Sequence, residues 1–180
     1  MFISRKLKQT NIAEYLIYMW QVEDIIRANK LDIDKLDSTY IAQFKLEDKE
    51  RKEMREWYSN IIEMMRREGV AQKGHIQINK NIIILLTDLH LTILKSHKFP
   101  FYSETYYKAL PLIVELRQKA GDEQKGEIET CFDALYGVLL LRIQGKEVSE
   151  ETKRAIDKIS QFIGMLSDYY HKDKEKPLDL

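Results

Sequence analysis

The sequence predicts an all-α protein: a single-domain bundle of about seven helices around a central apolar fourth helix. Three observations support this prediction. Apolar residues recur at helical spacing along most of the chain, no stretch shows the two-residue alternation of a strand, and the 180 residues include only seven glycines and three prolines. A chain of this length can bury enough surface for one core without disulfide or metal support. We therefore expect one domain over residues 1–180.

Both ends of the chain are polar. Residues 1–9 contain Arg5, Lys6 and Lys8 without an acidic residue, and we expect a basic N-terminal arm that is poorly ordered at its tip. No apolar run of signal-peptide length follows this arm. Residues 172–180 are expected to form a polar C-terminal tail.

Capping residues delimit the first three predicted helices. The first begins after Asn11, a common N-cap residue with Glu14 three positions on, and ends near residue 29. A short helix follows over about 33–44. The third covers about 47–68, ahead of Gly69 as its C-cap. Its apolar face is expected to be buried and consists of Met54, Trp57, Tyr58, Ile61 and Met65.

The fourth predicted helix, over about 79–96, is apolar nearly all round, which is typical of a central helix. Its apolar residues are Ile82, Ile83, Ile84, Leu85, Leu86, Leu89, Leu91, Ile93 and Leu94. We expect it to be the most buried helix. Exposure of Ile84 and Leu91 would mean either that this helix is not central or that these two residues belong to a subunit interface.

Three more helices complete the prediction. The fifth covers about 103–120, with Ser103 as a candidate cap and Gly121 beyond its end. Pro111 lies inside it and is expected to kink the helix or to start a new one. The sixth covers about 127–144, and the seventh begins at Ser149 and ends near residue 171.

Charge and cysteine content narrow the classes of partner and compartment. Lysine plus arginine equals aspartate plus glutamate, 29 each, so the whole chain has no net attraction to phosphate backbones or anionic lipid. We therefore expect neither a nucleic acid nor a membrane as partner. The longest aliphatic run, over 82–86, is too short to span a bilayer. One cysteine cannot form an internal disulfide, which favours a reducing cytoplasm.

Motifs for cofactors, metals and catalysis are missing from the sequence. No glycine spacing matches a nucleotide-binding loop, and no Ser/His/Asp set can be assembled. Asp168 and His171 have a usable metal-ligand spacing, but they adjoin the polar tail. Cys131 lies on an apolar stripe, where a buried structural thiol is expected. We expect no cofactor, no metal site and no catalytic residue.

Four ionisable side chains fall on apolar helix stripes: Glu23, His90, Arg117 and Arg142. An uncompensated buried charge costs several kcal/mol, so each needs a partner, an exit to water or a ligand. The arginines stand in the last turns of their helices, where a long stem can reach solvent and a cation complements the helix dipole. His90 is expected to be a hydrogen-bonded core histidine.

Glu23 is too short to reach water easily, and we expect it to form a buried ion pair with Arg117. If consecutive helices alternate in direction, Glu23 and Arg117 lie toward one pole, while His90 and Arg142 lie toward the other. If all four converge instead, the excess positive charge could receive a small anion. Aromatic residues such as Tyr106 would then wall the pocket or, alternatively, seal the end of the bundle. The candidate ligand-binding residues are Glu23, Arg117, His90, Arg142 and Tyr106.

Four runs in the chain resemble a known family: NIAEYLIYMWQVEDIIRA, QINKNIIILLTDLHL, FYSETYYKALPLIVELR and EIETCFDALYGVLLLR. They are similar to a group of Bacteroidetes proteins described as a domain of unknown function, number 4924. The resemblance covers about residues 10–171 and implies a stand-alone helical protein of the bacterial cytoplasm. It implies no activity and no catalytic residues.

Three functions remain open from the sequence. The first is a non-enzymatic protein that acts through protein–protein interaction or self-association as a homo-oligomer. The second is a binding module for a small anionic ligand at the Glu/Arg/His cluster. The third is an enzyme that uses the same cluster, with Glu23 and His90 as its acid and base.

Overall fold

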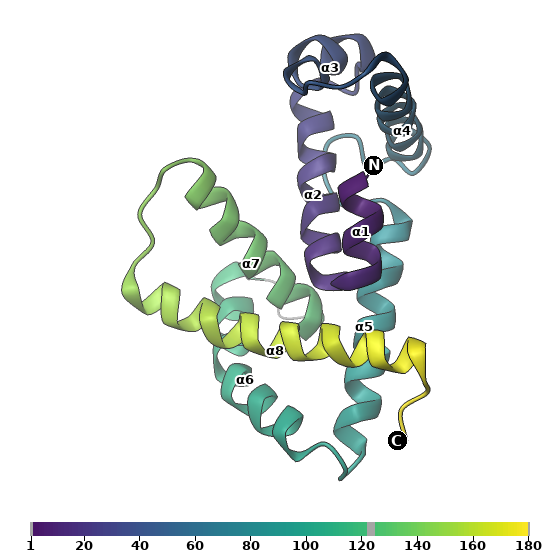
Figure 1. The fold of residues 1–180 in the computed structure, drawn as a ribbon. Helices are drawn as coiled ribbons and strands as arrows, with labels where there is room; N and C mark the ends of the chain where they lie inside the picture. The colour runs from purple at the N-terminus through teal and green to yellow at the C-terminus, as the bar shows by residue number, and fades with distance from the viewer. Residues whose placement is uncertain (1, 122–124, 180) are drawn as a thin grey trace. The chain divides into compact units, whose positions relative to one another are not determined.

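The computed structural model describes residues 2–121 and 125–179, which form an all-α protein (Figure 1). No strand occurs among these residues, so the predicted fold class is confirmed. The described elements are α1 Phe2–Thr10, α2 Ile12–Ala28, α3 Ile33–Thr39, the short 3-10 helix η1 Ile41–Gln43, α4 Asp48–Arg67, α5 Gln77–Lys95, α6 Pro100–Ala120, α7 Glu127–Ile143 and α8 Glu150–Glu175.

The helix ends follow the capping chemistry of the sequence. The Asn11 side chain accepts a hydrogen bond from the Ala13 amide at 3.1 Å, as expected of the predicted cap of α2. Ser149 caps α8 through the Thr152 amide. Glu47 and Glu50 form a capping box at the start of α4. These ends agree with the predicted ones to within about two residues, the usual uncertainty of helix boundaries.

Three predicted boundaries are wrong. Residues 2–10 form helix α1, where the sequence predicted a basic arm without a helix, so the described residues contain eight α-helices. The tip of this arm, Met1, lies outside the described residues. Helix α6 starts at Pro100, so Ser103 is not its cap, and Pro111 lies inside a continuous helix. Helix α8 extends to Glu175, so the first four residues of the expected polar tail, 172–175, are helical.

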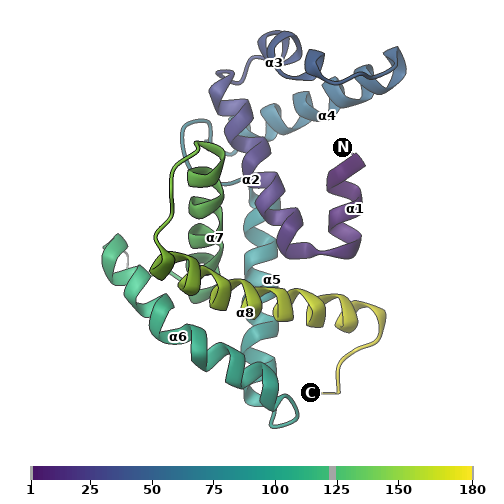
Figure 2. The ribbon, with the colours of Figure 1, turned by 60° about the vertical axis from the view of Figure 1, so that its left-hand side comes forward.

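The chain forms two compact units. The first consists of Met1–Gln9 and Glu14–Asn81, and the second of Thr10–Ala13 and Ile82–Leu180. The prediction of one domain over residues 1–180 stays a prediction, because two such units can belong to one domain. In the second unit, α8 packs against α6 and α7 (Figure 2). The largest buried side chains of this unit are Tyr102, Phe132 and Phe162.

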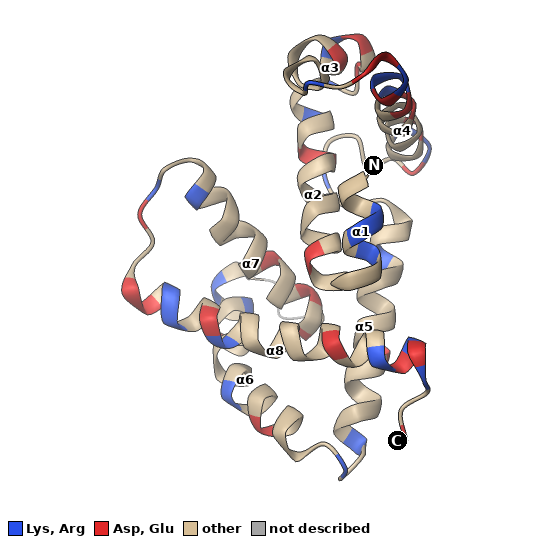
Figure 3. Cartoon of the chain, viewed as in Figure 1, with Lys and Arg blue, Asp and Glu red and all other residues tan. Residues whose placement is uncertain are grey.

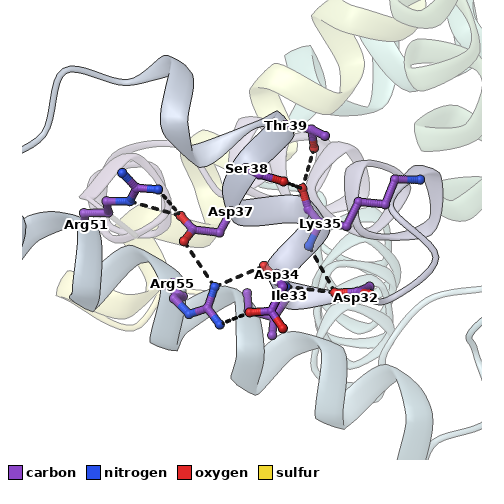
Figure 4. Close-up of polar contacts among 9 residues, drawn as sticks. All are labelled: Asp32, Ile33, Asp34, Lys35, Asp37, Ser38, Thr39, Arg51 and Arg55. Carbon is purple, nitrogen blue, oxygen red and sulfur yellow. Dashed lines mark hydrogen bonds and ion pairs between the residues drawn. The ribbon is translucent and has the colours of Figure 1, made fainter.

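In the first unit, ion pairs join α3 to α4 (Figure 4). The Asp37 carboxylate accepts from Arg51 on one oxygen and from Arg55, 3.1 Å away, on the other. Arg55 also contacts Asp34 at 2.5 Å. These two helices and η1 also contribute buried side chains to the core of the unit: Leu36 from α3, Ile41 from η1 and Tyr58 from α4.

The prediction that the fourth predicted helix, which is α5, is the central and most buried helix is not confirmed. Ile82, Leu86 and Ile93 are buried, but Ile84 and Leu91 are 53% and 48% exposed. The apolar residues of α5 therefore divide into an inward row and an outward row. Of the two explanations stated for such exposure, a subunit interface is taken up below.

Candidate functional site

Glu23 is fully buried and accepts hydrogen bonds from three groups of the first unit. Its Oε1 receives the Ile76 amide at 3.0 Å and the Asn79 side-chain amide at 2.8 Å. Its Oε2 lies 2.5 Å from Nδ1 of His75. Because a carboxylate oxygen only accepts, Nδ1 carries the hydrogen of this contact. The buried carboxyl group is therefore satisfied by hydrogen bonds inside the unit.

These contacts place Glu23 at the N-terminal end of α5, which begins at Gln77. The first amides of a helix have no acceptor within the helix, and the helix dipole favours a negative group there. Glu23 thus acts as a cap supplied from another helix. This role explains why a carboxyl group occupies a core position on α2.

The His75 ring is held on two sides. It stacks on Trp20 with ring centroids 4.0 Å apart and an interplanar angle of 10°. Arg27 donates to the carbonyl oxygens of Val70 and Gly74, which fixes the loop that carries His75. The His75 side chain is 25% exposed, so the Glu23–His75 pair reaches the surface of the unit. Chemically, the contact with the carboxylate at Nδ1 favours one tautomer of the ring and leaves Nε2 as the nitrogen for a further partner.

The expected ion pair between Glu23 and Arg117 is wrong, because each side chain has its partners within its own unit. Arg117 lies 3.6 Å from Glu127 and donates to the Lys125 carbonyl oxygen at 3.1 Å. Glu23 is bound by the groups described above. Glu23 is buried and Arg117 is half-buried, but the two side chains do not form an ion pair with each other.

The second unit contains a polar group within its aromatic core, which we call the His90–Glu127 cluster. It consists of His90, Tyr102, Tyr106, Arg117 and Glu127. Nδ1 of His90 lies 2.7 Å from the Tyr102 hydroxyl, and the His90 ring meets the Tyr106 ring edge-on at 4.7 Å. The Tyr106 hydroxyl donates to Glu127 at 2.8 Å, and Glu127 in turn pairs with Arg117. The structure therefore brings together His90, Tyr106 and Arg117, with Glu127 as the acid.

Burial determines the protonation of this cluster. Desolvation lowers the pKa of His90, against the opposing effect of Glu127, so the ring stays neutral. Burial also raises the pKa of Tyr102 and of Tyr106, whose hydroxyls stay protonated. Nε2 of His90 is buried and has no hydrogen-bond partner among the described residues. With Arg117 matched by Glu127, the cluster has no excess positive charge.

Arg142 is not part of either cluster. It is exposed at the end of α7, where it lines a surface hollow of about 560 Å³ together with Lys146, Lys153 and Glu147. Its long side chain reaches solvent, which is the alternative that the sequence analysis weighed for both arginines. The five candidate residues are therefore distributed over three places: Glu23 in the first unit, Arg142 at the surface, and the other three in the His90–Glu127 cluster.

Sequence reasoning missed His75, Asn79, Tyr102 and Glu127 as partners in these sites. His75 lies in a loop without periodicity, so no pattern could indicate its contact with Glu23. Glu127 stands in the first turn of a helix, where an acidic residue is common, and nothing in its spacing marks it as the partner of Arg117.

Among residues 2–121 and 125–179, no group of three or more histidine, cysteine, aspartate or glutamate side chains could hold a metal ion. Cys131 is buried in the second unit. Burial raises the pKa of its thiol, so the reactive thiolate is disfavoured. No helix in these ranges has the length and apolarity needed to cross a bilayer.

The described helices and the two buried polar clusters define an all-α protein. The chain belongs to the family described as "Domain of unknown function (DUF4924)", whose model matches residues 1–177. The resemblance inferred from the four sequence runs is thereby confirmed. No curated protein and no solved structure matches the chain.

Proposed function

We propose that this is a non-enzymatic protein that acts through self-association, and that one face of α5 makes the contact. The observation that supports the proposal is the outward row of α5, which we call the α5 stripe: Ile84, Leu85 and Leu91. These side chains are 53%, 51% and 48% exposed in a helix whose opposite side is buried. Ile84 and Leu91 are seven residues apart, so they lie on the same face of the helix, with Leu85 at its flank.

Two features favour a second copy of the same chain as the partner. A two-fold contact uses one patch twice, so a single apolar stripe is enough to form it. The formal net charge is zero, so copies of the chain do not repel one another at long range.

A reducing cytoplasm suits a protein whose one cysteine is buried and unpaired, and we propose that compartment.

The alternative of a small anionic ligand has less support. A hollow of about 310 Å³ adjoins Arg117 and is also lined by Lys125 and Asp133. Lys125 pairs with Asp133 there, and Arg117 pairs with Glu127. Both cations beside the hollow are thus already matched by carboxylates. The enzyme alternative named Glu23 and His90, which belong to different units and different hydrogen-bond networks.

Sedimentation velocity over a concentration series tests the proposal. We expect the wild-type chain to form dimers as its concentration rises, and Ile84→Ser with Leu91→Ser to stay monomeric. Ile143→Ser is the control, because it removes an aliphatic side chain that is even more exposed, at 65%, from α7. A wild-type chain that sediments only as a monomer at high micromolar concentration would refute the proposal. Equal dimer formation by the Ile84/Leu91 variant would show that another surface is used.

A further inference from the structure

Helix α1 carries the densest one-signed charge of the described chain. Its nine residues include Arg5, Lys6 and Lys8 and no acid, and in Figure 3 its charged residues are all blue. The net charge of zero for the whole chain conceals this local charge of three. Field strength near a surface depends on local charge, because screening in physiological salt limits its range to about 8 Å.

Two large apolar side chains on α1 point away from the first unit. Phe2 and Ile3 are 53% and 55% exposed, whereas Ser4 is buried and Leu7 is half-buried. The helix is attached to the unit through this inner side, and the Lys8 ammonium lies 5.6 Å from the centre of the Tyr15 ring on α2. The outward side therefore combines exposed apolar groups with cations.

Helical geometry places these groups next to one another. At about 100° per residue, Lys6 falls about 40° from Phe2 on the side of Ile3, and Arg5 falls about 60° from Phe2 on the other side. Lys6 therefore lies between the two apolar side chains, and Arg5 lies beside Phe2. A helix with this mixture can lie in the plane of a lipid interface, because the long side chains of lysine and arginine reach the headgroups while the apolar groups enter the boundary layer. A polyanion without an apolar layer, such as nucleic acid, would leave Phe2 and Ile3 in water.

We propose that α1 docks the protein on an anionic lipid surface, with Phe2 and Ile3 at the boundary between headgroups and acyl chains. Arg5 and Lys6 then lie at the level of the lipid phosphates and carboxylates, where each cation contributes to binding. This contact is peripheral, and it uses a surface different from the α5 stripe. The proposal departs from the expectation that no membrane is a partner, because that expectation considered the net charge of the whole chain and not the local charge of α1.

Vesicle sedimentation with the full chain tests this proposal. We expect binding to vesicles of phosphatidylcholine mixed with phosphatidylserine, little binding to phosphatidylcholine alone, and weaker binding as salt rises. Arg5→Gln with Lys6→Gln should lower the partition coefficient by about 25-fold, since each cation near an anionic surface accounts for about fivefold. Phe2→Ser with Ile3→Ser should reduce it as well. Lys49→Gln with Lys52→Gln, on the exposed side of α4, is the matched charge control and should bind as the wild type does.

A second measurement reports where α1 lies. In Phe2→Trp, tryptophan emission should shift to the blue when mixed vesicles are added, while the wild type with only Trp20 and Trp57 should not shift. Circular dichroism checks that each variant keeps the helix content of the wild type. Absence of vesicle binding, equal loss in the Lys49/Lys52 control, or binding to an oligonucleotide duplex without binding to vesicles would each overturn the proposal.

Discussion

A buried carboxylate needs hydrogen-bond donors from several directions, and Glu23 obtains them from one short stretch of chain. His75, Ile76 and Asn79 all lie within five residues around the start of α5. The same side chain thus closes a loop and caps a helix. Its removal would leave three donors without acceptors inside the first unit.

We predict that Glu23→Ala lowers the free energy of unfolding by about 3–5 kcal/mol, because the buried donors lose their acceptor. Glu23→Gln should cost less, since its amide oxygen can still accept from Ile76 and Asn79. Denaturant unfolding at neutral pH measures both. A double-mutant cycle with His75→Gln should give a coupling energy of about 1 kcal/mol or more, and the same cycle with Arg117→Gln should give a value near zero.

Lys30 adopts a backbone conformation that is costly for a residue with a side chain. Its φ is 58°, and it follows the end of α2 at the position where glycine is preferred. The Leu31 amide donates to the Ile26 carbonyl at 3.0 Å and the Lys30 amide to that of Arg27 at 2.9 Å, which is the Schellman pattern of a helix C-terminus.

We predict that Lys30→Gly raises the free energy of unfolding by about 0.5–1 kcal/mol, because glycine adopts positive φ without steric strain. The gain is smaller than the strain relieved, since glycine also increases the entropy of the unfolded chain. Thermal unfolding measures the change. Lys52→Gly, the same substitution within α4, should instead destabilise by about 1 kcal/mol. Destabilisation by Lys30→Gly would contradict the strained conformation.

At the scale of elements, α3 is too short to be stable alone and depends on α4. Asp37 is the centre of their ion-pair network, with its side chain 18% exposed, whereas Asp34 is 86% exposed. Coulombic attraction is weaker in water than at a partly buried site. The Arg55–Asp37 pair should therefore contribute more to the free energy of unfolding than the Arg55–Asp34 pair.

We predict that Asp37→Asn lowers the free energy of unfolding by about 1 kcal/mol and that Asp34→Asn lowers it by less than about 0.5 kcal/mol. The loss at Asp37 should shrink in high salt, because screening weakens the pairs in the wild type as well. Denaturant unfolding at two ionic strengths measures this difference. An equal loss from both substitutions would argue that exposure does not control these ion pairs.

Most elements could be predicted because their ends carry local signals. Asn11, Gly69 and Ser149 mark helix boundaries through their own hydrogen bonds or backbone freedom, which act over a few residues. Helix α1 was missed for the opposite reason. Its three cations suggest a solvated segment, whereas Ser4 is buried in the structure, and the sequence pattern gives no sign of this burial.

The candidate site was predictable in kind but only partly in its pairing. The helical period placed the ionisable residues Glu23, His90 and Arg117 on apolar stripes, and in the structure Glu23 and His90 are buried and Arg117 is half-buried. Which partner each one finds depends on contacts across 10 to 56 residues, for example Asn79 with Glu23, and periodicity carries no information about these. The exposure of Ile84 likewise follows from which helices cover α5, not from the composition of α5 itself.

For the whole molecule, two histidines of the second unit make stability depend on pH. Burial lowers the pKa of His90, and desolvation together with Lys174 lowers the pKa of His171, whose Nε2 accepts from the Ile12 amide at 3.1 Å. Both lie below the ordinary value of 6.5 in the folded chain. The unfolded chain therefore binds more protons than the folded chain as the pH falls below about 6.5.

We predict that the unfolding temperature is constant above about pH 7.5 and falls as the pH decreases from 7 to 5. Each histidine should lower the free energy of unfolding by at most about 1.4 kcal/mol per pH unit in this range. Calorimetry across this range measures the slope. His90→Gln or His171→Gln should flatten the profile, and His97→Gln, at an exposed position, should leave it unchanged. A profile that stays flat in the wild type would contradict the lowered pKa values.

The path of the chain has a consequence for dissection of the protein. The chain passes from one unit to the other at residues 9–10, 13–14 and 81–82, so a single cut cannot release two separate pieces. The second unit includes Asn11, which accepts from Ser167 at 3.1 Å, and Ile12, which binds His171. A fragment that starts at residue 82 would lack this N-terminal tether. If mixing this fragment with a fragment of residues 1–81 restores the helix content of the whole chain, the protein is suited to split-protein complementation.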